Sequence, residues 1–105
     1  MPYIITRCWY PPNKLDEVVN KYLEVMKKYP PDASLGKQIV PVATTTCKDG
    51  LESFSVLEVE KQKVGDALDR EKTAFMEFRN IEGFNYEIKT WTTVEEGLAR
   101  MGLGG

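Results

Sequence analysis

The chain has 105 residues, 42% hydrophobic and 29% charged, a composition that predicts one globular domain over residues 1–105. Its net charge of −2 without a basic block argues against a nucleic-acid partner, and it has neither a membrane-length apolar run nor a signal-like N-terminus, so we expect a cytoplasmic protein. The absence of histidine removes the commonest metal ligand and the commonest general base, and we expect no metal and no cofactor.

Residues 2–10 are rich in β-branched and aromatic side chains and stop at Pro11-Pro12, which predicts a strand. A helix is predicted over residues 13–29, with Asn13 as its N-cap and Asp16 completing a capping box. The apolar residues of this segment recur at helical spacing: Leu15, Val18, Val19, Tyr22, Leu23 and Met26.

Residues 36–47 and 51–60 predict two strands joined by a two-residue turn at Asp49-Gly50. Pro41 has no N–H to donate to a neighbour, so we place the first of these strands at a sheet edge. The turn pairs residue 48 with 51 and so assigns two faces to the hairpin. We expect these residues to lie under helices: Val40, Val42, Thr44, Ser55, Leu57 and Val59.

A second helix is predicted over residues 64–79, and its apolar positions include Val64, Ala67, Leu68, Phe75 and Phe78. Residues 84–92 predict the last strand. A short helix with a capping box between Thr93 and Glu96 should follow, and residues 102–105 should form a loose tail.

The order strand–helix–strand–strand–helix–strand predicts an α+β, ferredoxin-like βαββαβ fold, a four-stranded antiparallel sheet with two helices on one face. Side-chain alternation places Cys8 under the helices and Arg7 on the opposite, open face, because a buried guanidinium would be costly to desolvate. The open face then gathers Tyr3, Ile5, Arg7, Trp9, Phe54, Val56, Glu58, Glu87 and Trp91.

These open-face residues supply the candidate ligand-binding site, although no catalytic residue can be assigned. Arg7 with Glu58 or Glu87 could clamp an anion or carbonyl, or could be a structural ion pair at a dimer interface. The aromatic members could form a wall for a flat ligand or simply pack in that interface. They are Trp9, Phe54 and Trp91.

Cys8 and Cys47 are the only cysteines, and they are too far apart in sequence for a CxxC site. Two thiols without histidine make no zinc cage. We therefore expect two buried free thiols, with Cys8 on the helix side of its strand.

Over residues 2–92 the chain resembles the dimeric α/β-barrel superfamily, on the basis of topology, length and the aromatic-plus-polar open face. The resemblance implies a homodimer whose two sheets meet by their open faces and enclose a cavity. Members include cofactor-free monooxygenases, muconolactone isomerase-like proteins and ligand-sensing regulatory domains. The haem-handling members use a histidine ligand, which this chain lacks.

Two functions follow as hypotheses. One is a homodimeric barrel that binds a small, partly aromatic or anionic molecule in a sheet-lined cavity, with or without cofactor-free oxygenase- or isomerase-type chemistry. The alternative is a non-catalytic regulatory or assembly module whose open face is only a dimer interface. An RNA-recognition domain shares the strand order, but residues 51–60 lack its basic-aromatic pattern.

Overall fold

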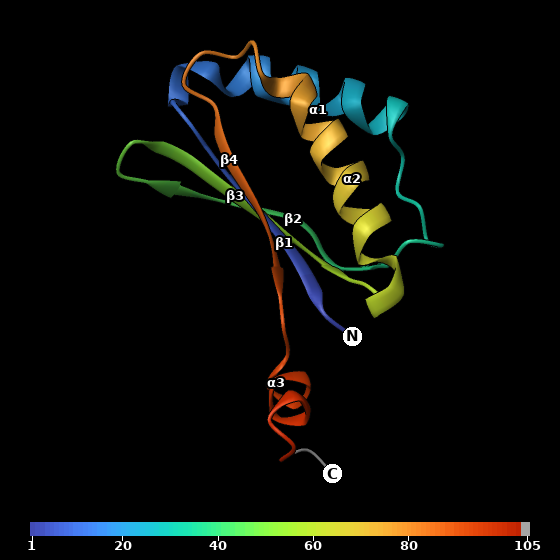
Figure 1. Cartoon of the computed structure of the whole chain (residues 1–105). Helices are drawn as coiled ribbons and strands as arrows, with labels where there is room; N and C mark the ends of the chain where they lie inside the picture. Colours follow the sequence, from blue (N-terminus) through green and yellow to red (C-terminus); the bar gives the residue numbers. More distant parts are fainter. Residues whose placement is uncertain (104–105) are drawn as a thin grey trace.

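The structure, a computed structural model, describes residues 1–103 and contains the predicted elements in the predicted order (Figure 1). The strands are β1 (Tyr3–Tyr10), β2 (Lys37–Cys47), β3 (Gly50–Glu58) and β4 (Asn85–Trp91). The α-helices are α1 (Leu15–Lys28), α2 (Val64–Phe75) and α3 (Val94–Arg100). Short 3₁₀ turns are η1 (Pro12–Lys14), η2 (Lys61–Lys63) and η3 (Met76–Phe78). Residues 104 and 105 of the predicted tail lie outside the described residues.

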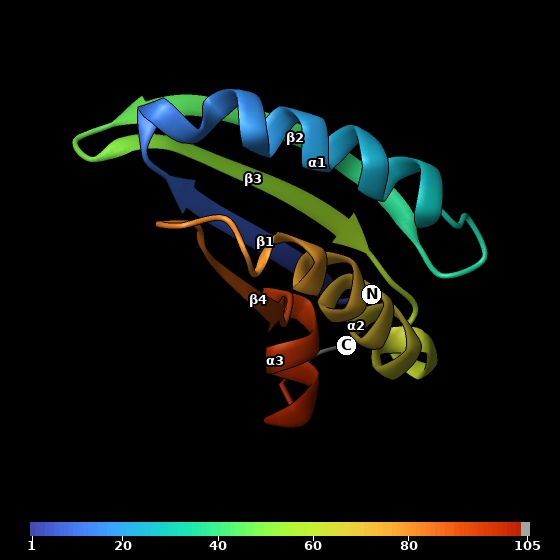
Figure 2. The ribbon, with the colours of Figure 1, turned by 90° about the horizontal axis from the view of Figure 1, so that it is seen from above.

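The four strands form one antiparallel sheet in the order β2-β3-β1-β4. Helices α1 and α2 lie on the same face of this sheet (Figure 2). The predicted α+β, ferredoxin-like fold is therefore confirmed, and so is the edge position of the strand that contains Pro41. No helix in the described part of the chain is long and apolar enough to cross a bilayer.

The two faces of β1 differ as alternation predicts. Ile4, Thr6 and Cys8 are buried beneath the helices, and Ile4 is only 1% exposed. The opposite face of β1 carries Arg7, which is exposed and lies between Phe54 of β3 and Glu87 of β4. The predicted division into a helix-covered face and an open face is confirmed for this strand.

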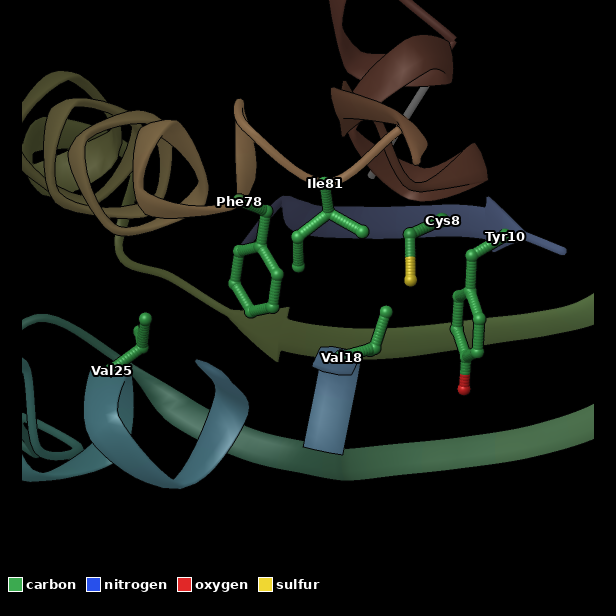
Figure 3. Packing of buried hydrophobic residues seen from close by; sticks show 6 residues of the cluster. All are labelled: Cys8, Tyr10, Val18, Val25, Phe78 and Ile81. Atoms are coloured by element: carbon green, nitrogen blue, oxygen red, sulfur yellow. The ribbon is translucent and has the colours of Figure 1, made fainter. Parts of the chain in front are cut away.

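The core on the helix-covered face consists of two separate clusters. The larger cluster contains Cys8, Tyr10, Val18, Val25, Phe78 and Ile81 (Figure 3). The smaller cluster contains Ile4, Val59 and Ala67. In Figure 3, the side chains of Cys8 and Tyr10 project from β1 toward the side on which Val18 lies. Each cluster joins the sheet to the helix layer, and the two clusters are separate from each other.

The hairpin between β2 and β3 differs from the predicted one. Cys47 pairs with Gly50, so the turn residues are Lys48 and Asp49. Gly50 is nevertheless required, because its φ is +146° and a Cβ there would lie 2.3 Å from the carbonyl oxygen of Tyr10. This glycine permits the close approach of β1 rather than the turn itself.

The register of this hairpin is also shifted. Thr44 pairs with Ser53, two residues nearer the turn than predicted, and further irregularities occur on either side of Val40. They bring Val40 opposite Val56, on the open face, so its predicted place under the helices is wrong. Pro41 cannot donate to the strand ladder, and an edge strand accommodates a bulge at such a position.

The start of α1 corrects a second prediction. Residues 12–14 form η1, and no side chain caps either η1 or α1, so the predicted capping box of Asn13 and Asp16 is wrong. The backbone N–H of Lys14 instead donates to the carbonyl oxygen of Pro11 at 3.0 Å. A proline-initiated turn therefore leads into the helix.

Only part of the predicted apolar stripe of α1 is buried. Val18 is buried together with Val25, which lies outside that stripe, whereas Leu15, Val19 and Leu23 remain exposed. The main neighbours of α1 are η1 and η3 rather than any strand. It consequently does not press against the sheet along its whole length.

Helix α3 projects away from the sheet and from the other two helices (Figure 1). Its predicted capping box is confirmed, because Thr93 accepts from the Glu96 backbone N–H and Glu96 accepts from that of Thr93, each at 3.1 Å. The described chain measures 50 × 31 × 19 Å and its radius of gyration is 15.4 Å. A closed chain of this length would have about 13 Å.

The two cysteines provide a test of the burial pattern. Both thiols are free, but only Cys8 is buried, and burial raises the pKa of its thiol, whereas Cys47 is half-buried. Because the thiolate is the reactive form, Cys47 should react with an alkylating reagent faster than Cys8 in the native protein. Labelling kinetics followed by mass spectrometry, with Cys47→Ser as control, would measure this. Equally fast labelling of Cys8 would contradict the assigned face.

Candidate functional site

A cleft of about 770 Å³ lies between the two helices and the sheet. Its helical walls include Tyr22 and Met26 of α1 and Ala74 and Phe75 of α2. Its floor includes Ser55 and Leu57 of β3, and residues 30–36, which connect α1 to β2, border it. The volume is in the range of small-molecule sites, and the walls are mainly apolar, as such sites usually are.

A polar band interrupts the core at this cleft. On the sheet, Thr6 of β1 lies directly opposite Ser55 of β3, and both side chains point to the helix-covered face. On α2, Ala67 packs in the smaller cluster and Phe75 borders the larger one, so Glu71 lies between the two clusters. The two halves of the core therefore do not join across the middle of the sheet.

Glu71 occupies a position where helical spacing would place an apolar side chain. It lies three residues after Leu68 and four before Phe75, on the same stripe of α2. Burial raises the pKa of its carboxyl, and the neighbouring charge of Arg70 opposes this shift. Within residues 1–103 no hydrogen bond or ion pair reaches this carboxylate, which is half-buried and keeps some contact with solvent. A carboxylate of this kind in a cleft is a candidate functional group.

Two cations on the α2 side of the cleft, Arg70 and Lys63, have partners of their own. Arg70 donates to the carbonyl oxygen of Pro30 at 2.6 Å, and Lys63 donates to that of Ser34 at 2.7 Å. Both bonds tie the α2 side of the cleft to the connection between α1 and β2. The Ser34 hydroxyl and N–H donate to Asp32, which lowers the pKa of that carboxyl. These polar contacts hold the connection in place.

The predicted site lies on the other face of the sheet. Arg7 donates to Glu52 at 2.5 Å, and a second nitrogen of its guanidinium lies 3.8 Å from Glu87. The guanidinium also lies 5.0 Å from the ring centre of Trp9. A shallow hollow of about 290 Å³ adjoins Arg7 and Phe54. This face therefore brings together most of the predicted residues around one paired cation.

Two predicted members lie farther along this face. Glu58 pairs in register with Tyr3 and with Lys37 near the end of β3, where it also borders the cleft, so it does not join the Arg7 group. Trp91 lies opposite Tyr3 on β4 and is 50% exposed. The ligand-binding role of the open-face residues remains a prediction.

Sequence reasoning missed Glu52 and Glu71. Side-chain alternation along β3 places Glu52 on the same face as Phe54. This alternation could have predicted Glu52 as a partner of Arg7. For Glu71 the signal is a charged residue inside an apolar helical stripe. Within residues 1–103 no three His, Cys, Asp or Glu side chains gather closely enough to hold a metal ion.

No protein-family model and no curated protein matches this sequence. Two solved structures share its fold. One is a protein of Shewanella loihica PV-4 described as a "putative monooxygenase", with a TM-score of 0.51 and 13% identity over 89% of this chain and 94% of that chain. The other is the de novo designed protein Foldit4, with a TM-score of 0.50 and 15% identity over 88% of this chain and 96% of that one. At such identities the likeness shows the fold alone.

The position of Glu71 predicts a stability effect that depends on pH. Because folding raises the pKa of this carboxyl, its cost to folding is full above the raised pKa and disappears as pH falls toward the ordinary glutamate range. Glu71→Gln should therefore raise the free energy of unfolding at neutral pH by about 1 kcal/mol, and by less at acidic pH. Urea unfolding at both pH values measures this. The exposed Glu82→Gln is the control, and a destabilised Glu71→Gln at neutral pH would contradict the assignment.

Proposed function

We propose that this protein is a homodimer that binds a small, largely apolar molecule in the cleft between its helices and its sheet. The observation that supports this most directly is the cleft itself, whose mainly apolar walls include the unpaired carboxylate of Glu71. A concave apolar site with a few polar groups is the usual form of a small-molecule site. Cofactor-free oxygenase- or isomerase-type chemistry on the bound molecule is compatible with the proposal.

The shared fold is consistent with this proposal but is not the evidence for it. The Shewanella loihica protein, described as a "putative monooxygenase", has a similar architecture. The designed protein Foldit4 has the same architecture as well. Because one fold hosts unrelated functions, the argument for binding depends on the cleft and its residues.

The dimer is proposed through the open sheet face. Large apolar side chains there face solvent in the single chain, and Phe54 is 41% exposed. The charges on this face balance, because Arg7 is paired with Glu52 and Glu87, and Lys89 lies 3.6 Å from Glu87. Two copies of a neutral face can meet without repulsion in a two-fold interface.

The extended shape supports the same partner. Helix α3 carries exposed apolar side chains, and Val94 and Met101 are 78% and 71% exposed. A second copy on the open face would offer α3 a surface to cover. The assembly-module alternative agrees with this interface, and what separates the two functions is the occupation of the cleft.

Cleft binding is tested with the uncharged fluorophore N-phenyl-1-naphthylamine. We expect saturable binding with one site per chain, because its apolar body suits the cleft walls. Ala74→Phe places a ring in the cleft from α2. Because the fluorophore then loses apolar contact with the cleft walls, its binding should weaken at least about tenfold. Ser55→Leu, which fills it from the floor, should act similarly.

Thr73→Phe is the matched control for this experiment. Thr73 comes directly before Ala74 in α2, and its side chain is exposed. A phenyl ring at this position lies outside the cleft and should leave binding unchanged. Circular dichroism verifies that each variant is folded. Absence of saturable binding to the wild-type chain, or equal binding by folded Ala74→Phe, would refute binding in this cleft.

The dimer is tested by light scattering at micromolar concentration. The wild-type chain should be dimeric, and Arg7→Ala should dissociate more readily, because it leaves Glu52 and Glu87 facing their copies without a cation. Lys72→Ala, an exposed change on α2, should leave the dimer intact. A folded wild-type chain that is monomeric under these conditions would overturn the proposed dimer.

A further inference from the structure

We infer that the molecule bound in the cleft is an apolar amine whose ammonium group pairs with the Glu71 carboxylate. This inference rests on the proposed function, because it concerns the occupant of the same cleft. It goes further by assigning the charge of the ligand and the residue that recognises it.

The first argument is the unmatched charge of Glu71. Within residues 1–103 the carboxylate has neither a hydrogen-bond donor nor a salt-bridge partner, and its side chain is half-buried in the cleft. A carboxylate in such a place is stabilised most by a group that brings both a positive charge and N–H donors. An ammonium group supplies both, whereas an alcohol supplies only a donor and a carboxylate would repel Glu71.

The second argument is that the neighbouring cations compensate for the charge of Glu71 only in part, through the nearby charge of Arg70. Arg70 and Lys63 donate to backbone carbonyl oxygens of the connection between α1 and β2. Lys63 also lies 3.9 Å from Glu60. Lys37 lies on β2, at the edge of the sheet opposite β4, whereas α2 contacts β4. The ionisable groups that border the cleft besides Glu71 are Tyr22, Tyr29, Asp32, Lys37, Glu58, Glu60, Lys63, Arg70 and the N-terminal amine of Met1, which lies 3.6 Å from Glu96.

The third argument comes from the aromatic walls. Tyr22 of α1 and Phe75 and Phe78 near the end of α2 border the cleft. Aromatic faces attract an ammonium ion and also pack against an apolar body. Aromatic walls beside the Glu71 carboxylate are suited to an organic cation with a hydrophobic portion.

Three ligands with the same aromatic body test the assigned charge: 1-naphthylmethylamine, 1-naphthylmethanol and 1-naphthoic acid. Isothermal titration calorimetry at neutral pH should rank the cationic amine first, about tenfold tighter than the neutral alcohol, because charge-assisted hydrogen bonds are stronger than neutral ones. The anionic acid should bind most weakly. Equal affinity of the amine and the alcohol would overturn the inference.

Glu71→Gln links the preference to this residue. The variant keeps the shape and removes the charge, so the amine should lose about tenfold in affinity while the alcohol changes little and the acid gains. The exposed Glu82→Gln should change none of the three. A folded Glu71→Gln that keeps the full preference for the amine would refute the role of Glu71.

The pH dependence provides a second readout. The primary amine stays charged from neutral to acidic pH, so its affinity should fall as Glu71 becomes protonated, and this fall should be absent in Glu71→Gln. Asp32, Glu58 and Glu60 titrate in both proteins, so the difference between them reports on Glu71. The same fall in both proteins would refute the inference. If none of the three ligands binds to the wild-type chain, both the proposed function and the inference are refuted. If all three bind with equal affinity, the inference is refuted and the proposed small-molecule binding is retained.

Discussion

A four-stranded sheet has two faces, and two helices can cover only one of them. Side-chain alternation along β1 points neighbouring residues to opposite faces, so Cys8 is buried in the helix-covered core and Arg7 lies on the open face. This constraint leaves an open face that carries large apolar side chains and balanced charges. The same constraint places both helices in one layer above the other face, and the cleft lies between this layer and the sheet.

The cleft exists because the core is divided. Thr6 and Ser55 form a polar pair in the middle of the helix-covered face, and Glu71 lies between the two apolar clusters on α2. Apolar side chains at these positions would allow α1 and α2 to close over one continuous core. A half-buried, unpaired carboxylate reduces stability, and proteins commonly retain such a cost where a site requires it.

The two faces of the sheet differ in how their charges are compensated. On the open face Arg7 is held by Glu52 and Glu87, and a cation with two such partners is a poor clamp for an external anion. In the cleft Glu71 has no partner within residues 1–103. The same sheet thus offers one face suited to an identical copy and one suited to a small molecule of complementary charge.

The sequence alone determined the order of elements, the ferredoxin-like fold and the faces of β1, because hydrophobic periodicity and proline positions are local signals. The hairpin register, the place of Val40 and the start of α1 were decided by the tertiary structure, where β1 approaches Gly50 and Pro41 interrupts an edge strand. The cleft and the isolation of Glu71 also required it, since they depend on how far α1 stands from the sheet. That separation results from packing between distant segments, and no local pattern encodes it.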